Sequence, residues 1–104
     1  MIILVLLLLQ SITGNVKISG PGYIQAAHSV TLDWVASPTQ GVGYRIYRSS
    51  TPGGPYTLYA FGIRGVQYTD TNVRSGETWY YIARAVDAQG NESVNSNEAS
   101  ATVP

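Results

Sequence analysis

The sequence predicts a single all-β domain built from short antiparallel strands. Apolar and polar residues alternate with a period of two in several stretches, as half-buried strands require. Clusters of Gly, Pro, Ser, Thr and Asn separate these stretches, and no helical period appears after residue 14. A chain of 104 residues matches one domain with one compact core.

The first two predicted strands lie in the N-terminal third of the domain. NVKISG, residues 15–20, places Val16 and Ile18 on one face. HSVTLDW follows at residues 28–34, and the residues of its apolar face are Val30, Leu32 and Trp34. The opposite face carries Ser, Thr and Asp, so each strand is expected to have one face buried.

The middle of the chain contains two further strands and a reversal between them. GVGYRIYRSS, residues 41–50, turns Tyr44 and Ile46 inward. STPGGPYTLY then contains a turn cluster that no strand interior tolerates, made of Pro52, Gly53, Gly54 and Pro55. The chain must therefore change direction there, before the short strand VQYTDTNV at residues 66–73.

The longest alternation is SGETWYYIARAVDAQGNES, residues 75–93. One face of it carries Trp79, Tyr81, Ala83 and Ala85. The other face carries Tyr80, Ile82, Arg84 and Val86. A Gly90-Asn91 turn ends this strand, and SNEASATVP at residues 96–104 closes the chain as an edge strand.

Composition excludes several classes of function. Six basic residues balance six acidic ones, and charged residues make up only 12% of the chain, so no basic patch for nucleic acid is expected. The absence of cysteine rules out a disulfide framework and a thiolate metal site. With His28 as the single histidine, we expect no catalytic site, no metal site and no cofactor.

Three stretches in order resemble the fibronectin type III family of the bacterial, extracellular kind over residues 15–104. They are SVTLDW with its final tryptophan, GYRIYRS with its inward tyrosine, and SGETWYYIARAVDAQGNES leading to SNEASATVP. The resemblance implies a seven-stranded antiparallel Greek-key sandwich of the immunoglobulin-like type. It also places Trp79 where the family usually has a tyrosine that ties this strand to the preceding corner, so that bond is expected to be remade or lost.

The resemblance further implies a spacer, adhesion or binding module without catalysis. No motif sets a serine or carboxylate beside His28, which fits an ordinary surface or strand-end histidine. Arg64-Gly65-Val66 lacks the aspartate of the integrin-binding tripeptide, so that activity is not expected.

The stretch DAQGNES offers oxygen ligands and a formal glycosylation acceptor. Asp87, Asn91 and Glu92 could be read as calcium ligands, but their spacing is not that of a calcium loop. Asn91-Glu92-Ser93 fits the acceptor pattern. We expect a turn held by side-chain hydrogen bonds rather than an ion site or a modified asparagine.

Aromatic residues exceed the needs of one small core. Alternation predicts an inward position for Trp34, Tyr44, Tyr68, Trp79 and Tyr81. It predicts an outward position for Tyr47, Tyr59 and Tyr80. Outward tyrosines are compatible with cross-strand pairs, with contacts in an assembly interface or with a surface on which sugars stack. Carbohydrate binding has no motif of its own to support it.

The chain opens with the apolar run MIILVLLLL, residues 1–9. We predict an N-terminal segment at residues 1–14 and the sandwich at residues 15–104. A secretory signal peptide matches its length, but the positive flank is absent and QSITG is a poor cleavage site. As a helix, residues 1–12 span about 18 Å, too short for a hydrocarbon core of about 30 Å. Burying the run is worth on the order of 10 to 20 kcal/mol.

We therefore predict that this run drives self-assembly into a filament as helix or strand, through Ile2, Ile3, Leu4, Val5, Leu6, Leu7, Leu8 and Leu9. The predicted protein is a non-enzymatic, extracellular or cell-surface homo-oligomer that binds no nucleic acid and does not span a membrane. The alternative is a binding or adhesion module of a larger secreted or surface protein, its leader a signal sequence or an expression remnant.

Overall fold

The computed structural model describes residues 7–19 and 23–104, which form seven strands. The strands are β1 (Leu7–Ser19), β2 (Tyr23–Trp34), β3 (Gly43–Ser49), β4 (Thr57–Ile63), β5 (Gln67–Asp70), β6 (Thr78–Val86) and β7 (Ala99–Thr102). Among these residues the structure has no helix long and apolar enough to cross a membrane.

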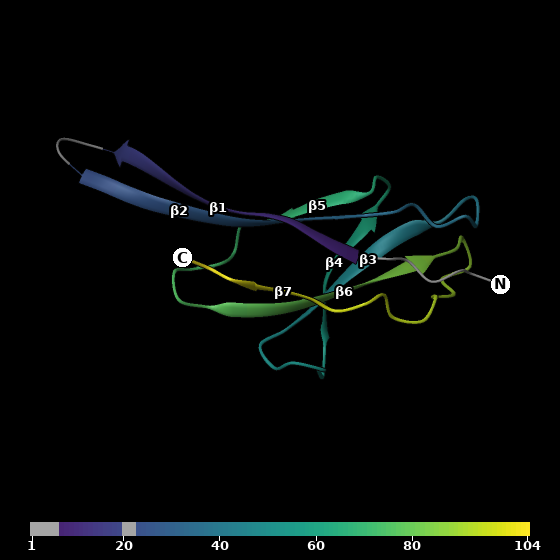
Figure 1. The fold of residues 1–104 in the computed structure, drawn as a ribbon. Helices are drawn as coiled ribbons and strands as arrows, with labels where there is room; N and C mark the ends of the chain where they lie inside the picture. The colour runs from purple at the N-terminus through teal and green to yellow at the C-terminus, as the bar shows by residue number, and fades with distance from the viewer. Residues whose placement is uncertain (1–6, 20–22) are drawn as a thin grey trace.

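Two antiparallel sheets make up the domain, in the orders β1-β2-β5 and β4-β3-β6-β7. Strand β5 pairs only with Val30–Asp33 of β2, whereas β1 pairs with β2 from Leu7 to Ser19. The β1–β2 hairpin consequently reaches beyond the other strands in Figure 1. The seven-stranded sandwich implied by the sequence is confirmed.

Strand β1 differs from the first strand predicted at residues 15–20. It begins at Leu7, and Leu7, Leu8 and Leu9 pair with Trp34, Asp33 and Leu32 of β2. A register shift between Leu9 and Ser11 separates these pairs from the rest of the strand. The predicted boundary between residues 14 and 15 thus falls inside a strand of the sandwich. The inference that residues 7–9 are surplus to the domain is wrong, because β2 is long enough to pair with them. The remaining predicted assembly residues, 2–6, lie outside the described part of the chain.

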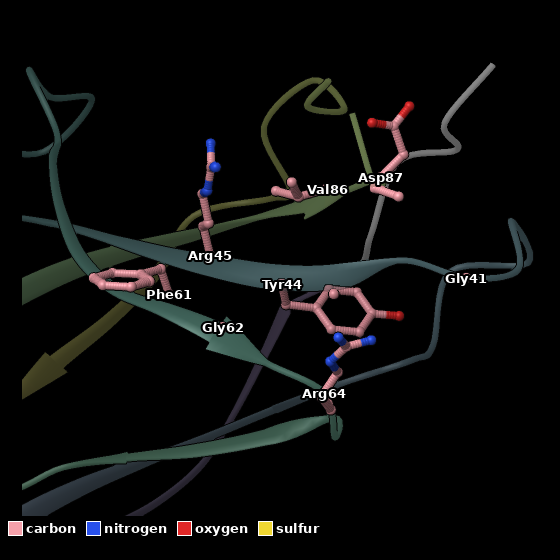
Figure 2. A pocket seen from close by; sticks show the side chains of 10 residues that line it. Gly41, Tyr44, Arg45, Phe61, Gly62, Arg64, Val86 and Asp87 are labelled. Carbon is pink, nitrogen blue, oxygen red and sulfur yellow. The ribbon is translucent and has the colours of Figure 1, made fainter. Parts of the chain in front are cut away.

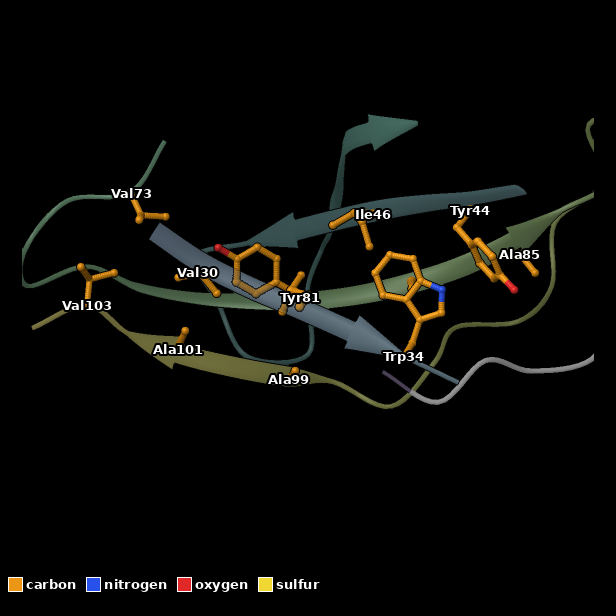
Figure 3. Packing of buried hydrophobic residues seen from close by; sticks show 12 residues of the cluster. Val30, Trp34, Tyr44, Ile46, Val73, Tyr81, Ala85, Ala99, Ala101 and Val103 are labelled. Atoms are coloured by element: carbon orange, nitrogen blue, oxygen red, sulfur yellow. The ribbon is translucent and has the colours of Figure 1, made fainter. Parts of the chain in front are cut away.

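The core lies between the two sheets and is centred on aromatic and small apolar residues (Figure 3). Its buried members are Val30, Leu32, Trp34, Tyr44, Ile46, Val73, Tyr81, Ala83, Ala85, Ala99, Ala101 and Val103. The Trp34 and Tyr44 rings meet edge to face with their centroids 5.3 Å apart. The indole Nε1 of Trp34 is buried with no hydrogen-bond partner among the described residues, so Trp34 stabilises the core through packing. Tyr68 and Trp79 are half-buried against this cluster, which confirms the five inward aromatics.

The Pro-Gly-Gly-Pro stretch forms the predicted reversal between β3 and β4. Glu98, on the segment leading into β7, holds this loop by accepting hydrogen bonds from the Gly53 N–H, at 2.8 Å, and from the Tyr56 hydroxyl. The Pro and Gly cluster predicted the turn, but alternation did not mark out the strand that follows it. That strand, β4, has an irregular register against β3, which hides its period.

The corner before β6 is closed by a local contact in place of the family's tyrosine bond. The Trp79 Nε1 donates to Oε1 of Glu77 at 3.2 Å, and the Arg74 N–H donates to the same oxygen at 2.6 Å. The backbone hydrogen bond from Arg74 is the main reason that the pKa of Glu77 lies below its ordinary value. The corner bond is therefore remade within the six residues from Arg74 to Trp79.

Candidate functional site

Strand β4 contains two irregularities that decide where its aromatic side chains point. Tyr44 pairs with Ile63 and Ile46 pairs with Ala60, so the two residues Phe61 and Gly62 face the single residue Arg45 of β3. Gly62 has a φ of +70°, a conformation that side chains disfavour. A bulge of this kind bends the strand and re-aims a side chain.

Phe61 is turned into solvent by this bulge. Its side chain is 74% exposed, the largest value among the exposed large hydrophobic residues of the described chain. Sequence analysis did not single Phe61 out. The available signal was the Phe-Gly pair directly before Ile63, since a glycine inside a strand often marks a bulge.

A cleft of about 310 Å³ opens beside this bulge at one end of the four-stranded sheet (Figure 2). It lies over the start of β3, between the end of β4 and the turn that follows β6. Its lining residues are Gly41, Gly43, Tyr44, Arg45, Phe61, Gly62, Arg64, Val86, Asp87 and Ala88. Three of them are glycines, so backbone rather than side chain forms much of its wall.

The second irregularity turns Tyr59 inward. Ile46 pairs with Ala60 and Tyr47 pairs with Leu58, which leaves Tyr59 as an extra residue on β4. Its hydroxyl donates to Oδ1 of Asp70 at 2.6 Å. The prediction that Tyr59 faces outward is wrong, because one inserted residue reverses the alternation on which it was based.

Asp70 of β5 is fully buried and accepts hydrogen bonds from side chains of three strands in the opposite sheet, β3, β4 and β6. Its Oδ2 accepts from Tyr81 at 2.7 Å and from Arg48 Nη1 at 3.0 Å, and its Oδ1 also accepts from the Asn72 N–H at 2.9 Å. Burial, followed by the hydrogen bond to this carboxylate, raises the pKa of Tyr59 to about 12 and that of Tyr81 further. The Arg48 guanidinium lies 4.0 Å from the ring centroid of Tyr59. This network satisfies a buried charge and is structural.

Glu92 is the centre of a second cluster, on the outer face of the four-stranded sheet. It accepts from Arg45 Nη1 and Arg84 Nη1, each at 3.0 Å, and from the Tyr47 hydroxyl. Burial raises the pKa of Glu92, but the hydrogen bonds from Tyr47, Arg45 and Arg84 together bring it below its ordinary value. The Arg84 guanidinium also lies 4.5 Å from the Tyr47 ring centroid. Tyr47 is thus half-buried and engaged within its own sheet.

Tyr80 is the third predicted interface aromatic. It lies opposite Ser49 of β3 and Ser100 of β7, and its side chain is half-buried. Tyr47 of β3 and Tyr80 of β6 keep the predicted outward orientation. Their role in an interface stays a prediction.

The DAQGNES turn has the predicted side-chain hydrogen bonds. Asp87 Oδ1 accepts from the Gln89 N–H at 3.0 Å and the Asn91 N–H at 2.9 Å, and its Oδ2 accepts from Asn91 Nδ2 at 3.0 Å. The side-chain bond from Asn91 is the main reason that the pKa of Asp87 is lowered. Among the described residues no group of three or more His, Cys, Asp or Glu is placed to hold a metal ion.

The Asn91-Glu92-Ser93 acceptor pattern is built into this turn. The Asn91 side chain donates to Asp87, and Ser93 is buried, with its hydroxyl accepting from the Ala85 N–H at 2.9 Å. The tripeptide therefore has a structural role. His28 is half-buried in β2 opposite Gly14.

Known proteins resemble this chain in sequence and in fold. A fibronectin type III-like protein from Clostridium thermocellum is 42% identical, with a TM-score of 0.65 over 73% of this chain and 77% of that one. The chain belongs to the fibronectin type III family. No protein-family model matches it.

Two larger proteins contain a similar segment. The amylopullulanase of Thermoanaerobacter thermohydrosulfuricus is 39% identical over 92 residues, which is 88% of this chain but 6% of that protein. The β-1,2-glucanase of Parabacteroides distasonis is 30% identical, with a TM-score of 0.65 over 95% of this chain and 14% of that one. These relatives support a module of a larger protein, the predicted alternative, and give no support to the predicted filament.

Proposed function

We propose that this chain is a non-catalytic accessory module of a larger extracellular protein that processes polysaccharide. The proposal is supported by its similarity to an amylopullulanase and a β-1,2-glucanase, in each of which it corresponds to a small share of the length. Because a fold alone does not define a function, the chemistry of the side chains has to agree with this role.

One structural observation carries the proposal: five of the six acidic side chains are committed to holding the fold. Hydrogen bonds from the protein itself are accepted by Asp70, Glu77, Asp87, Glu92 and Glu98. Glycoside hydrolysis requires two carboxyl groups that flank the scissile bond and are free to act as acid and as base or nucleophile. Side chains arranged in this way stabilise a sandwich and leave the chemistry to another part of a larger protein.

An extracellular location is part of the same proposal. Polymeric polysaccharides are too large to enter cells intact, so a module that assists their breakdown works outside the cell. The low charge and the absence of cysteine are compatible with that location and do not require it.

A fusion experiment tests the proposal. The chain is joined to a glycoside hydrolase catalytic domain, and hydrolysis of a soluble trisaccharide is compared with hydrolysis of the insoluble polymer. We expect an unchanged rate on the trisaccharide and a higher rate on the polymer. A matched fusion carrying Trp34→Ala, which disrupts the module core, should lose the gain.

Two results would contradict the proposal. One is release of reducing sugar by the isolated chain from starch, pullulan or cellulose. The other is equal hydrolysis of the polymer by the two fusions.

A further inference from the structure

Phe61 is the most exposed of the large hydrophobic residues in the described part of the chain. A phenyl side chain that is 74% exposed leaves apolar surface in water, and burying that surface against a ligand is favourable. The β4 bulge places this ring beside the cleft of about 310 Å³ (Figure 2). Bulges near the ends of sheets are used to re-aim side chains at binding sites.

Two arginine side chains, Arg45 and Arg64, line the same cleft and can donate further hydrogen bonds. Arg45 uses Nη1 for Glu92, and a guanidinium carries five N–H donors in total. Arg64 is exposed and takes no part in the ion pairs of the described side chains, Arg45–Glu92, Arg48–Asp70 and Arg84–Glu92. A ligand here would meet an apolar ring and guanidinium donors together.

The glycines of the lining shape the opening. A Cβ at Gly62 or Gly41 would meet no atom within 4 Å, so that space is open. At Gly43 a Cβ would lie 3.3 Å from the Ile63 carbonyl oxygen. A ligand can therefore approach the backbone of Gly41 and Gly62 without displacing side chains.

Charge and shape together select the class of ligand. Glu92 is shared by Arg45 and Arg84, and Asp87 lies in the same lining as Arg64. Two carboxylates thus face three guanidinium groups in and beside the cleft, so its net charge is small and positive. A hexopyranose ring offers an apolar C–H face for the phenyl ring and hydroxyl oxygens that accept hydrogen bonds from guanidinium groups. Sites that combine apolar walls with a few placed polar groups are typical of small-ligand binding.

We propose that the Phe61 cleft binds one hexopyranose unit of a neutral polysaccharide, by stacking on Phe61 and by hydrogen bonds from Arg45 and Arg64. This inference rests on the proposed accessory role and adds a ligand to it. Phe61 supplies the contact area, and Arg64 fixes the orientation of the sugar.

Titration of the whole chain with maltoheptaose, followed by NMR chemical shifts, tests the proposal. We expect saturable binding with shifts confined to residues around the cleft. Phe61→Ala should weaken binding at least about tenfold, which corresponds to about 1.4 kcal/mol. Phe61→Tyr keeps the ring and should retain binding, whereas Arg64→Gln should weaken it.

Val94→Ala is the matched control, since Val94 is 69% exposed and does not line the cleft. The proposal is overturned by three results: no saturable binding of maltoheptaose or cellohexaose, equal weakening by Phe61→Ala and Val94→Ala, or tighter binding of tetragalacturonate than of maltoheptaose. A lack of sugar binding together with a polymer-specific gain in the fusion experiment would reject this site while leaving the accessory role in place.

Discussion

Arg48 and Asp70 join the two sheets of the sandwich, with Nη1 of Arg48 in β3 lying 3.0 Å from Oδ2 of Asp70 in β5. The Asp70 side chain is fully buried and that of Arg48 is 12% exposed. The guanidinium is also stacked between aromatic rings, at 4.0 Å from the Tyr59 centroid and 3.7 Å from the Trp79 centroid. A pair this well surrounded keeps its geometry, and removing one partner leaves the other charge buried.

Arg48→Met should therefore lower the free energy of unfolding by about 3 to 5 kcal/mol, because it leaves the Asp70 carboxylate without its cation. Tyr81→Phe removes one hydrogen bond to the same carboxylate and should cost less, about 1 to 3 kcal/mol. Urea denaturation measures both losses. A double-mutant cycle with Asp70→Asn isolates the coupling, and additive losses would show that the pair is not coupled.

Trp34→Ala should lower the free energy of unfolding by about 3 to 5 kcal/mol, since it leaves a cavity next to the Tyr44 ring. Trp34 is 4% exposed and stabilises the core through packing alone. Chemical denaturation with the exposed Val94→Ala as control checks this. A loss below about 1 kcal/mol would place Trp34 outside the core.

Acidification should weaken the fold through Glu92. Its pKa is lowered in the folded state from an ordinary value of 4.5. The folded state then binds fewer protons than the unfolded state, so its contribution is present above pH 4.5 and is lost as the pH falls through the lowered pKa. Denaturation from neutral pH to about pH 3 should show a smaller fall for Glu92→Gln than for the wild type. Identical pH profiles would contradict the role of Glu92.

Alkaline conditions should weaken the fold through its half-buried tyrosines. The pKa of Tyr56 and that of Tyr59 are both raised to about 12, mainly by burial. The folded state holds protons that the unfolded state releases, so stability falls as the pH rises from about 10 to about 12. The phenolate absorbance should stay below that of free tyrosine at the same pH until the chain unfolds. Tyr59→Phe should reduce the loss of stability at high pH. Ordinary titration of all eight tyrosines in the folded state would contradict this.

Two N-terminal deletions distinguish the contribution of the first residues to stability from a contribution to self-assembly. Removing residues 1–6 keeps every described pair of β1 and β2, whereas removing residues 1–10 deletes the partners of Trp34, Asp33 and Leu32. The longer deletion should therefore be less stable than the shorter one, by about 1 kcal/mol or more in thermal or urea denaturation. Equal stability would mean that residues 7–10 add nothing to the sheet. Sedimentation of the protein that lacks residues 1–6 also tests self-assembly. Large particles that persist in it would exclude residues 1–6 as their cause.

The sequence by itself determined the fold class, most of the strands and the aromatic core. Alternation with a period of two is a local property, so Trp34, Tyr44 and Tyr81 could be assigned to the buried face without any knowledge of their neighbours. The Asp87 turn was equally local, because its acceptor and its donors lie within four residues of one another.

Only the tertiary structure decided where β4 places its side chains and how far β1 extends. Tyr59 points to Asp70 and Phe61 points to solvent because β4 is longer than the stretch of β3 that it pairs with, and a bulge is defined by two strands together. The start of β1 at Leu7 likewise depends on the length of β2. Pairing register between strands far apart in sequence, and with it the cleft beside Phe61, is set by contacts that no local pattern encodes.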